Sequence, residues 1–335
     1  MAFRVGLVGL GMAVTPHAKS LLDFKDRVEV AYAFSPSEER RQAFAQRFPF
    51  PLCDRLERIL QDSSVGAVLI LTPPNTHLEL ASRFAAAGKH ILLEKPLEIS
   101  TARAEDLVRK SAGVKLGVVL QHRFRPAAER LRSMLPGLGQ IVSASASIPN
   151  WRPQSYYDQP GRGTRARDGG GVLLTQGIHT LDLLLSFCGE AAEVRSYATT
   201  TPVHRMETED LVCAAVRWKS GALGVVHATT SAYPGAPERI ELIGTKGTAL
   251  LEGAALRVQI QGESPVVFST EAGSGGAGAD PMAFPHDWHR GVLADFLDAI
   301  EQDRPPRVNG AEALRVHRFI DMLLQGQRPG IDPPS

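Results

Sequence analysis

The chain has 335 residues, of which 43% are hydrophobic and 22% charged, and its formal net charge is +1. These values are typical of a globular protein with two domains, and they give no electrostatic reason to expect nucleic acid or a membrane as a partner. No apolar stretch approaches the ~20 residues of a membrane helix. The first strand begins by about Phe3, so we expect no signal peptide. Scattered cysteines without a C-x-x-C motif predict reduced thiols in a cytoplasmic protein; they are Cys53, Cys188 and Cys213.

Strands and helices alternate over the first third of the chain. Ser35, Pro36 and Glu38 predict a capping-box start for the second helix, with Pro36 at its first position. This alternation predicts an α/β fold, a doubly wound parallel sheet that forms a Rossmann domain over residues 1–121. The predicted strands are Phe3–Val8, Val28–Phe34, Ala67–Thr72, Ile91–Glu94 and Leu116–Leu120.

A run of strands replaces the alternation past about Gln121. Such a run predicts an α+β second domain with an antiparallel or mixed sheet over residues 122–335. We interpret Gly273–Gly278 as a mobile connector in preference to a substrate lid, and we expect a last helix over about Gly310–Gln325 that can pack back on the first domain. The predicted strands are Ile141–Ile148, Glu193–Thr201, Leu211–Trp218, Ala222–Thr230, Arg239–Ile243, Thr248–Glu252 and Leu256–Ile260.

A glycine-rich turn joins the first strand to the first helix. Backbone amides and a helix N-terminus at such a turn can receive a pyrophosphate, although Val14 replaces the third glycine of G-x-G-x-x-G. Together with the βαβ pattern, the turn predicts a nicotinamide dinucleotide. The turn contains Gly6, Gly9 and Gly11, and we expect Gly9, Gly11, Met12 and Ala13 to contact the cofactor.

The end of the second strand bears on the choice between NAD and NADP. Ala33–Pro36 contains no acidic residue to bind the ribose hydroxyls of NAD. Ser35, with Arg40 and Arg41 nearby, would accept a 2′-phosphate. The alternative is that Ser35 only caps the helix and the arginines form a solvated face. The sequence favours NADP over NAD by a small margin.

Two further motifs follow strands at their carboxyl ends, where open α/β sheets bind ligands. Thr72–His77 ends one strand, and a purely structural turn is the alternative to a cofactor contact there. Glu94-Lys95-Pro96 ends the next strand, and Lys95 can hold a substrate hydroxyl or carbonyl and exchange a proton with it. The predicted cofactor contacts in these motifs are Thr72, Pro73, Asn75, His77, Glu94 and Lys95.

Gly169-Gly170-Gly171 is interpreted as the flexible start of a helix that ends at Cys188. Apolar residues at helical spacing predict a buried stripe on this helix. Thr175, His179 and Asp182 form a second stripe beside it, so His179 projects next to the apolar face. Asp182 can orient the His179 imidazole and favour its protonated form.

Aromatic and arginine residues fill the loop before the glycines, from Trp151 to Thr164. Such a loop can stack on a sugar ring and bind its hydroxyls, a carboxylate or a phosphate, with surface packing as an equal alternative. His286 and His289 form an H-x-x-H pattern that we interpret as loop packing, and we predict no metal. The substrate-binding candidates are Arg123, Tyr156, Arg162, Thr175, Gln176 and Asp182.

The ordered set of motifs resembles the Gfo/Idh/MocA oxidoreductases over about Phe3 to Gln325. The motifs are Gly9-x-Gly11 with His17, Thr72–His77, Glu94-Lys95-Pro96, and Gly169-Gly170-Gly171 followed by His179 and Asp182. The resemblance implies a C-terminal domain with a large open, mostly antiparallel sheet, often used for homodimers or homotetramers. It also implies that Lys95 is the catalytic lysine, that a cis Lys-Pro bond can follow it, and that His179 is its partner.

One departure from the family separates this chain from relatives such as inositol dehydrogenase, which have an aspartate at the position of Thr175. Proton transfer would then fall on Lys95 and His179, with Tyr156 or Tyr157 as further candidates.

The first hypothesis is an NAD(P)-dependent oxidoreductase that moves hydride between nicotinamide and a secondary alcohol or ketone of a sugar, sugar acid, cyclitol or sugar nucleotide. The alternative is a non-catalytic, dinucleotide-sensing regulatory protein of the same fold.

Overall fold

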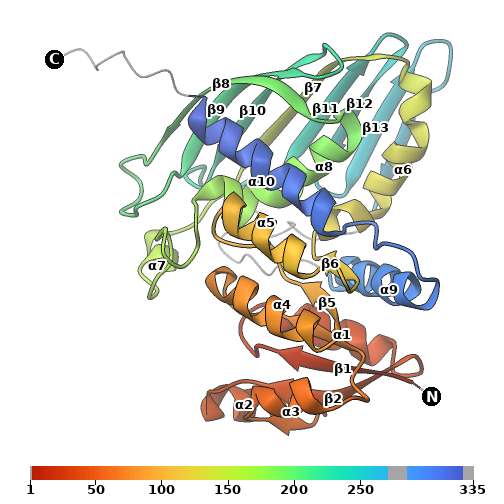
Figure 1. Cartoon of the computed structure of the whole chain (residues 1–335). Helices are drawn as coiled ribbons and strands as arrows, with labels where there is room; N and C mark the ends of the chain where they lie inside the picture. Colours follow the sequence, from red (N-terminus) through yellow and green to blue (C-terminus); the bar gives the residue numbers. More distant parts are fainter. Residues whose placement is uncertain (1, 271–284, 327–335) are drawn as a thin grey trace. The chain divides into compact units, whose positions relative to one another are not determined.

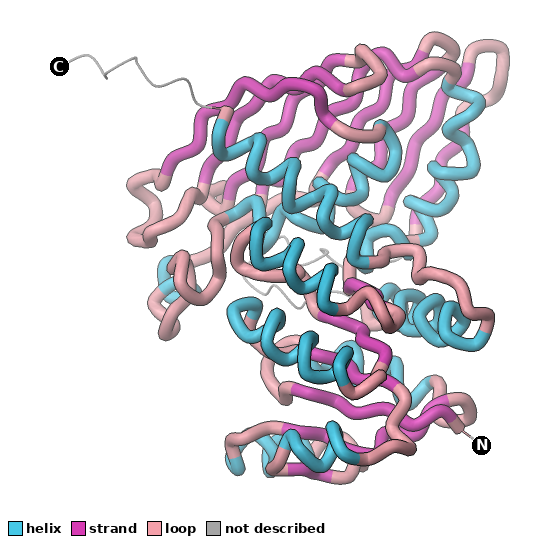
Figure 2. The backbone as a smooth tube through the Cα atoms, in the orientation of Figure 1, coloured by secondary structure: helices cyan, strands magenta, loops and turns pink. Residues whose placement is uncertain are grey.

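The computed structural model describes residues 2–270 and 285–326, so the predicted loop Gly273–Gly278 lies outside the described residues. Within them the chain forms two compact units (Figures 1 and 2). Unit 1 contains residues 2–125, 166–169 and 285–314, and unit 2 contains residues 126–165, 170–270 and 315–326.

Unit 1 is built on a six-stranded sheet in the order β3-β2-β1-β4-β5-β6, with all neighbouring strands parallel. This is the Rossmann strand order, and it confirms the predicted fold class. The strands are β1 (Phe3–Val8), β2 (Val28–Phe34), β3 (Leu52–Cys53), β4 (Ala67–Ile70), β5 (His90–Leu93) and β6 (Leu116–Val118). The helices are α1 (Val14–Asp23), α2 (Glu38–Ala45), α3 (Leu56–Gln61), α4 (His77–Ala86), α5 (Thr101–Lys110) and α9 (Asp287–Glu301).

The central strands of unit 1 are buried on both faces, which explains their unbroken apolar sequences. All four residues of β4 are buried, as expected for a parallel strand covered by helices on both sides. On one side, α1 packs against α9, which joins this core from far along the chain. Phe296 of α9 is 1% exposed and belongs to the same apolar cluster as Leu7 of β1 and Leu21 of α1.

Unit 2 is built on an eight-stranded sheet in the order β14-β13-β12-β11-β7-β10-β9-β8. Only β7 and β10 pair in parallel, so the prediction of a large, mostly antiparallel sheet is confirmed. Helices α6 (Pro126–Met134) and α8 (Ile178–Cys188) lie against one face (Figure 1). The strands are β7 (Ile141–Pro149), β8 (Ala191–Thr199), β9 (Leu211–Trp218), β10 (Leu223–Thr229), β11 (Arg239–Gly244), β12 (Gly247–Glu252), β13 (Ala255–Ile260) and β14 (Val266–Ser269).

Within the described residues, the second face of the unit 2 sheet is open to solvent. Buried and exposed residues alternate along β9 and β11, so one side chain in two points away from the helices. Tyr197, Val225 and Val267 are large apolar residues on the strands of this sheet that are 57–77% exposed. Two helices remain: α7 (Gln154–Tyr157) lies in unit 2, and α10 (Gly310–Gln325) begins in unit 1 and continues in unit 2. Among the described residues, no helix combines the length and apolarity needed to span a membrane.

The start of α2 differs from the prediction. The helix begins at Glu38, and its N-cap is Ser37, whose hydroxyl accepts from the Arg40 backbone N–H. Pro36 therefore precedes the helix, and Ser35 does not cap it. A second serine two residues later provides an equally good cap with the right spacing, which the capping-box pattern alone did not distinguish.

Candidate active site

Three parallel strands end side by side at one edge of the unit 1 sheet. The register aligns Val8 of β1 with Ile70 of β4, and Ile70 with Leu93 of β5. The ladder continues one step further, because the Leu71 N–H donates to Val8 O at 2.8 Å and the Glu94 N–H donates to Ile70 O at 2.9 Å. The glycine turn, the Thr72 turn and Lys95 therefore gather at the ligand-binding edge of the fold.

The glycine turn has the properties that a pyrophosphate requires. Gly9 has φ +102°, and a Cβ there would lie 2.9 Å from the backbone carbon of Leu71, so only glycine fits. A Cβ on Gly11 would meet nothing within 4 Å, which leaves this backbone open to a ligand. Ala13 is the N-cap of α1 and provides no side-chain cap, so the helix N-terminus can donate to an anion. Met12, 49% exposed, lies in the same turn.

Val14 occupies the position of the missing third glycine. Its side chain is 2% exposed and belongs to the apolar core of unit 1. The residue therefore packs α1 against the sheet, and the turn before it keeps the two glycines that matter for close approach of a dinucleotide.

Ser35 and Arg41 meet at the end of β2. Arg41 Nη1 donates to Ser35 O at 2.6 Å, and the Ser35 hydroxyl accepts from the Ser37 N–H at 3.3 Å. Arg41 is partly exposed and Arg40 is exposed. One guanidinium is thus tethered where the ribose of a bound dinucleotide would lie.

His77 holds two turns of the site together. Its Nε2 lies 2.9 Å from Thr72 O, and its Nδ1 lies 3.0 Å from Pro96 O. Burial lowers the pKa of His77, although its backbone hydrogen bonds act in the opposite direction. A neutral imidazole donates through one nitrogen only, but both nitrogens lie close to backbone carbonyls, so His77 packs between the Thr72 turn and the Lys95 turn. On the same segment, Thr72 is partly exposed, and Pro73 and Asn75 are exposed.

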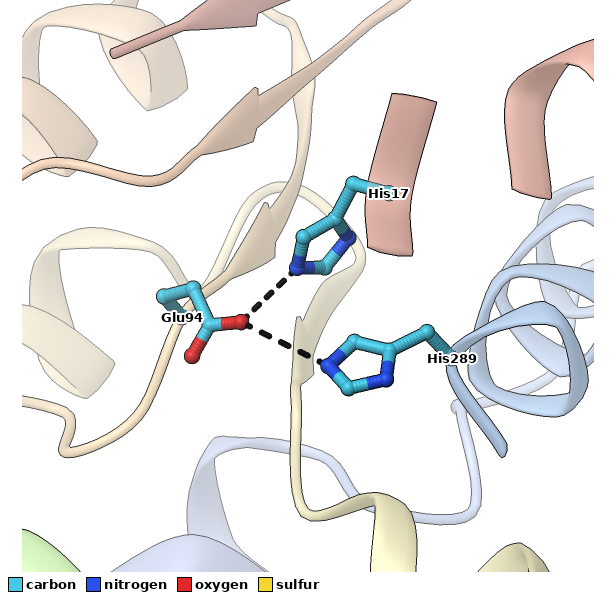
Figure 3. A group of neighbouring side chains, drawn as sticks. All are labelled: His17, Glu94 and His289. Carbon is cyan, nitrogen blue, oxygen red and sulfur yellow. Dashed lines mark hydrogen bonds and ion pairs between the residues drawn. The ribbon is translucent and has the colours of Figure 1, made fainter. Parts of the chain in front are cut away.

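Lys95 lies two residues after the end of β5 and is partly exposed, and the Lys95–Pro96 peptide bond is cis, as the family resemblance implies. The preceding Glu94 is buried and hydrogen-bonded to His17 of α1 (Figure 3). His289 is also part of this group, with its Nε2 3.9 Å from Glu94 Oε1. The interpretation of His289 as loop packing is wrong, because it lies in helix α9 and is 4% exposed.

Arg123, predicted to bind substrate, lies in a short 3₁₀ helix, Gln121–Phe124, after β6. It is 5% exposed, and its Nη1 donates to Glu312 Oε2 at 2.9 Å. Both residues belong to unit 1. The structure therefore gives this guanidinium an ion pair that fixes its position.

The helix that bears His179 is not the amphipathic helix that its spacing predicts. Leu173–Gly177 forms a π-helical turn ahead of α8, so Thr175 and His179 are not one α-helical turn apart. Helix α8 is buried almost all round; His179 is 9% and Asp182 1% exposed. Thr175 donates to Gly171 O at 2.6 Å and also contacts Gln176 Oε1.

The glycines before this helix are tightly packed, so their interpretation as a flexible segment is wrong. Gly169 has φ +77°, and a Cβ there would lie 2.4 Å from Ile99 O. A Cβ on Gly171 would lie 1.8 Å from Glu209 O. The missing side chains make room for neighbouring backbone.

The predicted substrate loop of unit 2 contains a stacked pair, since the Arg162 guanidinium lies 4.9 Å from the centroid of the Tyr156 ring. Tyr157, considered for proton transfer, donates from its hydroxyl to Thr230 Oγ1 at 2.9 Å. Burial raises the pKa of Tyr157 well above its ordinary value. The Tyr157 side chain is therefore neutral, and its hydrogen bond to Thr230 anchors the loop.

Sequence reasoning missed two buried acidic residues that fix neighbouring segments, one in each unit. Glu98, fully buried, accepts from the Leu78 N–H and from Arg103, which secures the segment after Lys95. Asp210 accepts from His204 in unit 2 at 2.7 Å between Oδ2 and Nδ1. Their partners lie 5 to 20 positions away in the sequence. These separations follow no helical or strand periodicity, so sequence patterns do not reveal the pairs. A charged residue directly beside a Pro-Leu segment was the only signal for Glu98.

A Rossmann strand order, a glycine turn and a lysine at the carboxyl edge of the sheet define the class of nicotinamide-dependent oxidoreductases. Residues 3–122 match the family model described as an oxidoreductase family with an NAD-binding Rossmann fold, and residues 131–250 match the GFO/IDH/MocA C-terminal domain. The chain therefore belongs to the Gfo/Idh/MocA oxidoreductase family.

Proteins of known activity resemble it over nearly the full length. Myo-inositol 2-dehydrogenase of Thermotoga maritima is 27% identical over 92% of this chain and 91% of its own. D-xylose 1-dehydrogenase (NADP(+)) 2 of Haloferax volcanii is 26% identical over 97% of both chains. The crystal structure of the WlbA dehydrogenase from Bordetella pertussis, in complex with NADH and UDP-GlcNAcA, matches with a TM-score of 0.83 at 25% identity, covering 97% of this chain and 95% of that one.

Proposed function

We propose that this protein transfers hydride between a nicotinamide cofactor and a secondary alcohol or ketone of a sugar, sugar acid, cyclitol or sugar nucleotide. The observation that supports the reaction best is Lys95, which follows β5 beside the glycine turn of β1 and the Thr72 turn of β4. The similar proteins named for inositol, xylose and UDP-GlcNAcA support polyhydroxylated substrates.

The bound nicotinamide would supply or accept the hydride. We propose that Lys95 donates a hydrogen bond to the reacting oxygen, stabilises negative charge on it and exchanges its proton. In unit 2, His179 is proposed as a second proton-exchanging group with Asp182 as its orienting acid. Substrate hydroxyls are proposed to contact Arg123, Tyr156, Arg162, Thr175 and Gln176.

A coupled assay tests this proposal. Oxidised and reduced cofactors are screened at a wavelength that reports reduced nicotinamide against a panel of sugars, sugar acids, cyclitols and sugar nucleotides. Turnover of at least one member is expected. Tight cofactor binding without turnover of any member would instead favour the dinucleotide-sensing alternative.

We propose NADP as the preferred cofactor. The support is the absence of an acid at the end of β2 and the Arg41 guanidinium tethered to Ser35 O. Arg41→Ala is expected to raise the Kd of NADPH about tenfold, because a phosphate would lose a charge-assisted hydrogen bond. The Kd of NADH, which lacks that phosphate, serves as the internal control. Fluorescence titration measures both, and equal weakening of the two cofactors would contradict the preference.

The open face of the unit 2 sheet is proposed to mediate a homodimer or homotetramer. Its exposed apolar side chains support an interface. Val225→Glu would place a charge on that face, on the interior strand β10, and is expected to convert the assembly to a 36.2 kDa monomer in light-scattering chromatography. Val203→Glu, 46% exposed and outside the strands, is the matched control. A wild-type monomer would refute the proposal.

The free thiols of Cys53, Cys188 and Cys213 support a reducing, cytoplasmic compartment.

A further inference from the structure

Glu94 lies at the centre of a buried group of side chains contributed by three separate elements (Figure 3). His17 comes from α1 and His289 from α9, while Glu94 follows β5. The three residues are 2%, 4% and 8% exposed, respectively. Such burial of a carboxylate is unfavourable unless other groups stabilise its charge.

The two oxygens of the Glu94 carboxylate have different partners. Oε1 lies 2.7 Å from His17 Nε2. Oε2 accepts from the backbone N–H of Lys95 at 3.0 Å. The carboxylate therefore links a histidine of α1 to the backbone of the proposed catalytic lysine.

The environment keeps Glu94 ionised. Burial opposes its charge, but the hydrogen bond from His17 and the electrostatic interactions with His17, His289 and, least of the three, Lys95 outweigh burial, and the pKa of Glu94 is below its ordinary value. His289 does not neutralise this charge, because burial lowers the pKa of His289 to about 3 and leaves it uncharged at neutral pH. The titratable groups that face Glu94 are His17 from α1, His289 from α9 and the adjacent Lys95.

A hydrogen bond accounts for this geometry better than a metal ion does. Two ligands of a tetrahedral zinc, each ~2.0–2.1 Å from the ion, lie roughly 3.3 Å apart. The His17 Nε2 to Glu94 Oε1 distance is 2.7 Å, which is short for two ligands of one ion and normal for a charge-assisted hydrogen bond. His289 packs edge-on against the His17 ring, with 4.9 Å between the centroids, and limits its movement.

We propose that Glu94, oriented by His17 and enclosed by His289, is a positioning residue for Lys95: it holds the Lys95 backbone, and its negative charge favours the protonated amine. The inference rests on the proposed function, in which Lys95 exchanges a proton with substrate. His77 fixes the opposite side of the same turn through Pro96 O. Glu94 and His77 thus hold the backbone on either side of Lys95. Of these two residues, only Glu94 is charged.

The test follows the titration of the Lys95 side chain by NMR on lysine-labelled protein, with the resonance assigned by its loss in Lys95→Met. Glu94→Gln keeps the shape and an acceptor oxygen but removes the charge. It is expected to move the Lys95 titration midpoint about one pH unit lower, and the corresponding limb of the kcat/KM profile should move with it. Because the NMR midpoint needs no turnover, it tests the inference even if the proposed reaction fails.

His17 variants test the orienting hydrogen bond. His17→Leu, which removes the donor, is expected to move the midpoint in the same direction as Glu94→Gln, whereas His17→Gln, which retains a side-chain N–H, should stay near wild type. His286→Gln is the matched control, since His286 pairs with Asp23 at 2.9 Å in the same unit without contacting Glu94. An unchanged midpoint in folded Glu94→Gln would overturn the inference. So would a stoichiometric metal ion, found by elemental analysis in wild type and lost in that variant.

Discussion

Lys95→Met is expected to lower kcat about 10³-fold while the Kd of the cofactor changes less than about threefold. Methionine has nearly the length of lysine but has neither a charge to stabilise the reacting oxygen nor a proton to exchange, and general acid–base catalysis contributes roughly 10²–10⁴-fold. The turn should survive, because Glu94 binds the backbone N–H of residue 95 and His77 binds Pro96 O. Steady-state kinetics and cofactor fluorescence measure the two quantities separately.

Two further variants make this result interpretable. Lys110→Met changes an exposed lysine of α5 in the same unit and should leave kcat unchanged. Lys95→Arg keeps a positive charge that cannot be released as a proton, so partial recovery would indicate that charge stabilisation contributes beside proton exchange. Turnover by Lys95→Met at the wild-type rate would refute the proposed role of Lys95.

Much of unit 1 could be predicted because its signals are local. The apolar strands Phe3–Val8 and Val28–Phe34 each depend on residues within a few positions, and the structure confirms both. Since parallel strands bring their carboxyl ends to one edge, the gathering of Gly9, the Thr72 turn and Lys95 followed from the strand pattern. The structure placed these segments as the pattern required.

The parts that escaped prediction depend on contacts between distant segments. His289 seemed unremarkable as part of H-x-x-H, yet α9 brings it to Glu94, 195 positions earlier in the chain. The π-helical turn at Leu173–Gly177 removes the simple spacing of Thr175 and His179, and no local residue preference distinguishes it from an α-helix. Tertiary packing decides such features, so a single sequence shows them poorly.

The glycine segment illustrates how composition alone misleads. Glycine is expected both where a chain must bend freely and where another backbone comes too close for a side chain. At Gly171 the second cause applies, because the Glu209 backbone and carboxylate fold over the start of the helix. The Gly171 N–H donates to Glu209 Oε1 at 3.1 Å, and the Val172 N–H donates to Glu209 O at 2.9 Å. Burial raises the pKa of Glu209 despite these bonds. Displacing this side chain would break the hydrogen bonds of a buried carboxyl group, which is unfavourable.

The two interpretations of Gly171 predict opposite signs for Gly171→Ala. A flexible glycine replaced by alanine stabilises a protein by about 0.4–1 kcal/mol, since the unfolded chain loses freedom. A Cβ placed 1.8 Å from Glu209 O must instead push backbone aside and break the hydrogen bonds that Glu209 accepts at the start of this helix. We therefore expect a loss of about 3 kcal/mol, seen as a fall of roughly 6–10 °C in apparent Tm by differential scanning fluorimetry.

Gly113→Ala provides the matched control for this measurement, because a Cβ there meets nothing within 4 Å and the residue has no left-handed φ. Its Tm should change by less than about 2 °C. Since Thr175 also donates to Gly171 O, displacement of this backbone should extend to the helix that bears His179. Reduced kcat at temperatures well below the Tm of Gly171→Ala would show that the glycine positions the proposed substrate residues as well as the fold, whereas a Tm equal to or above that of wild type would restore the flexible interpretation.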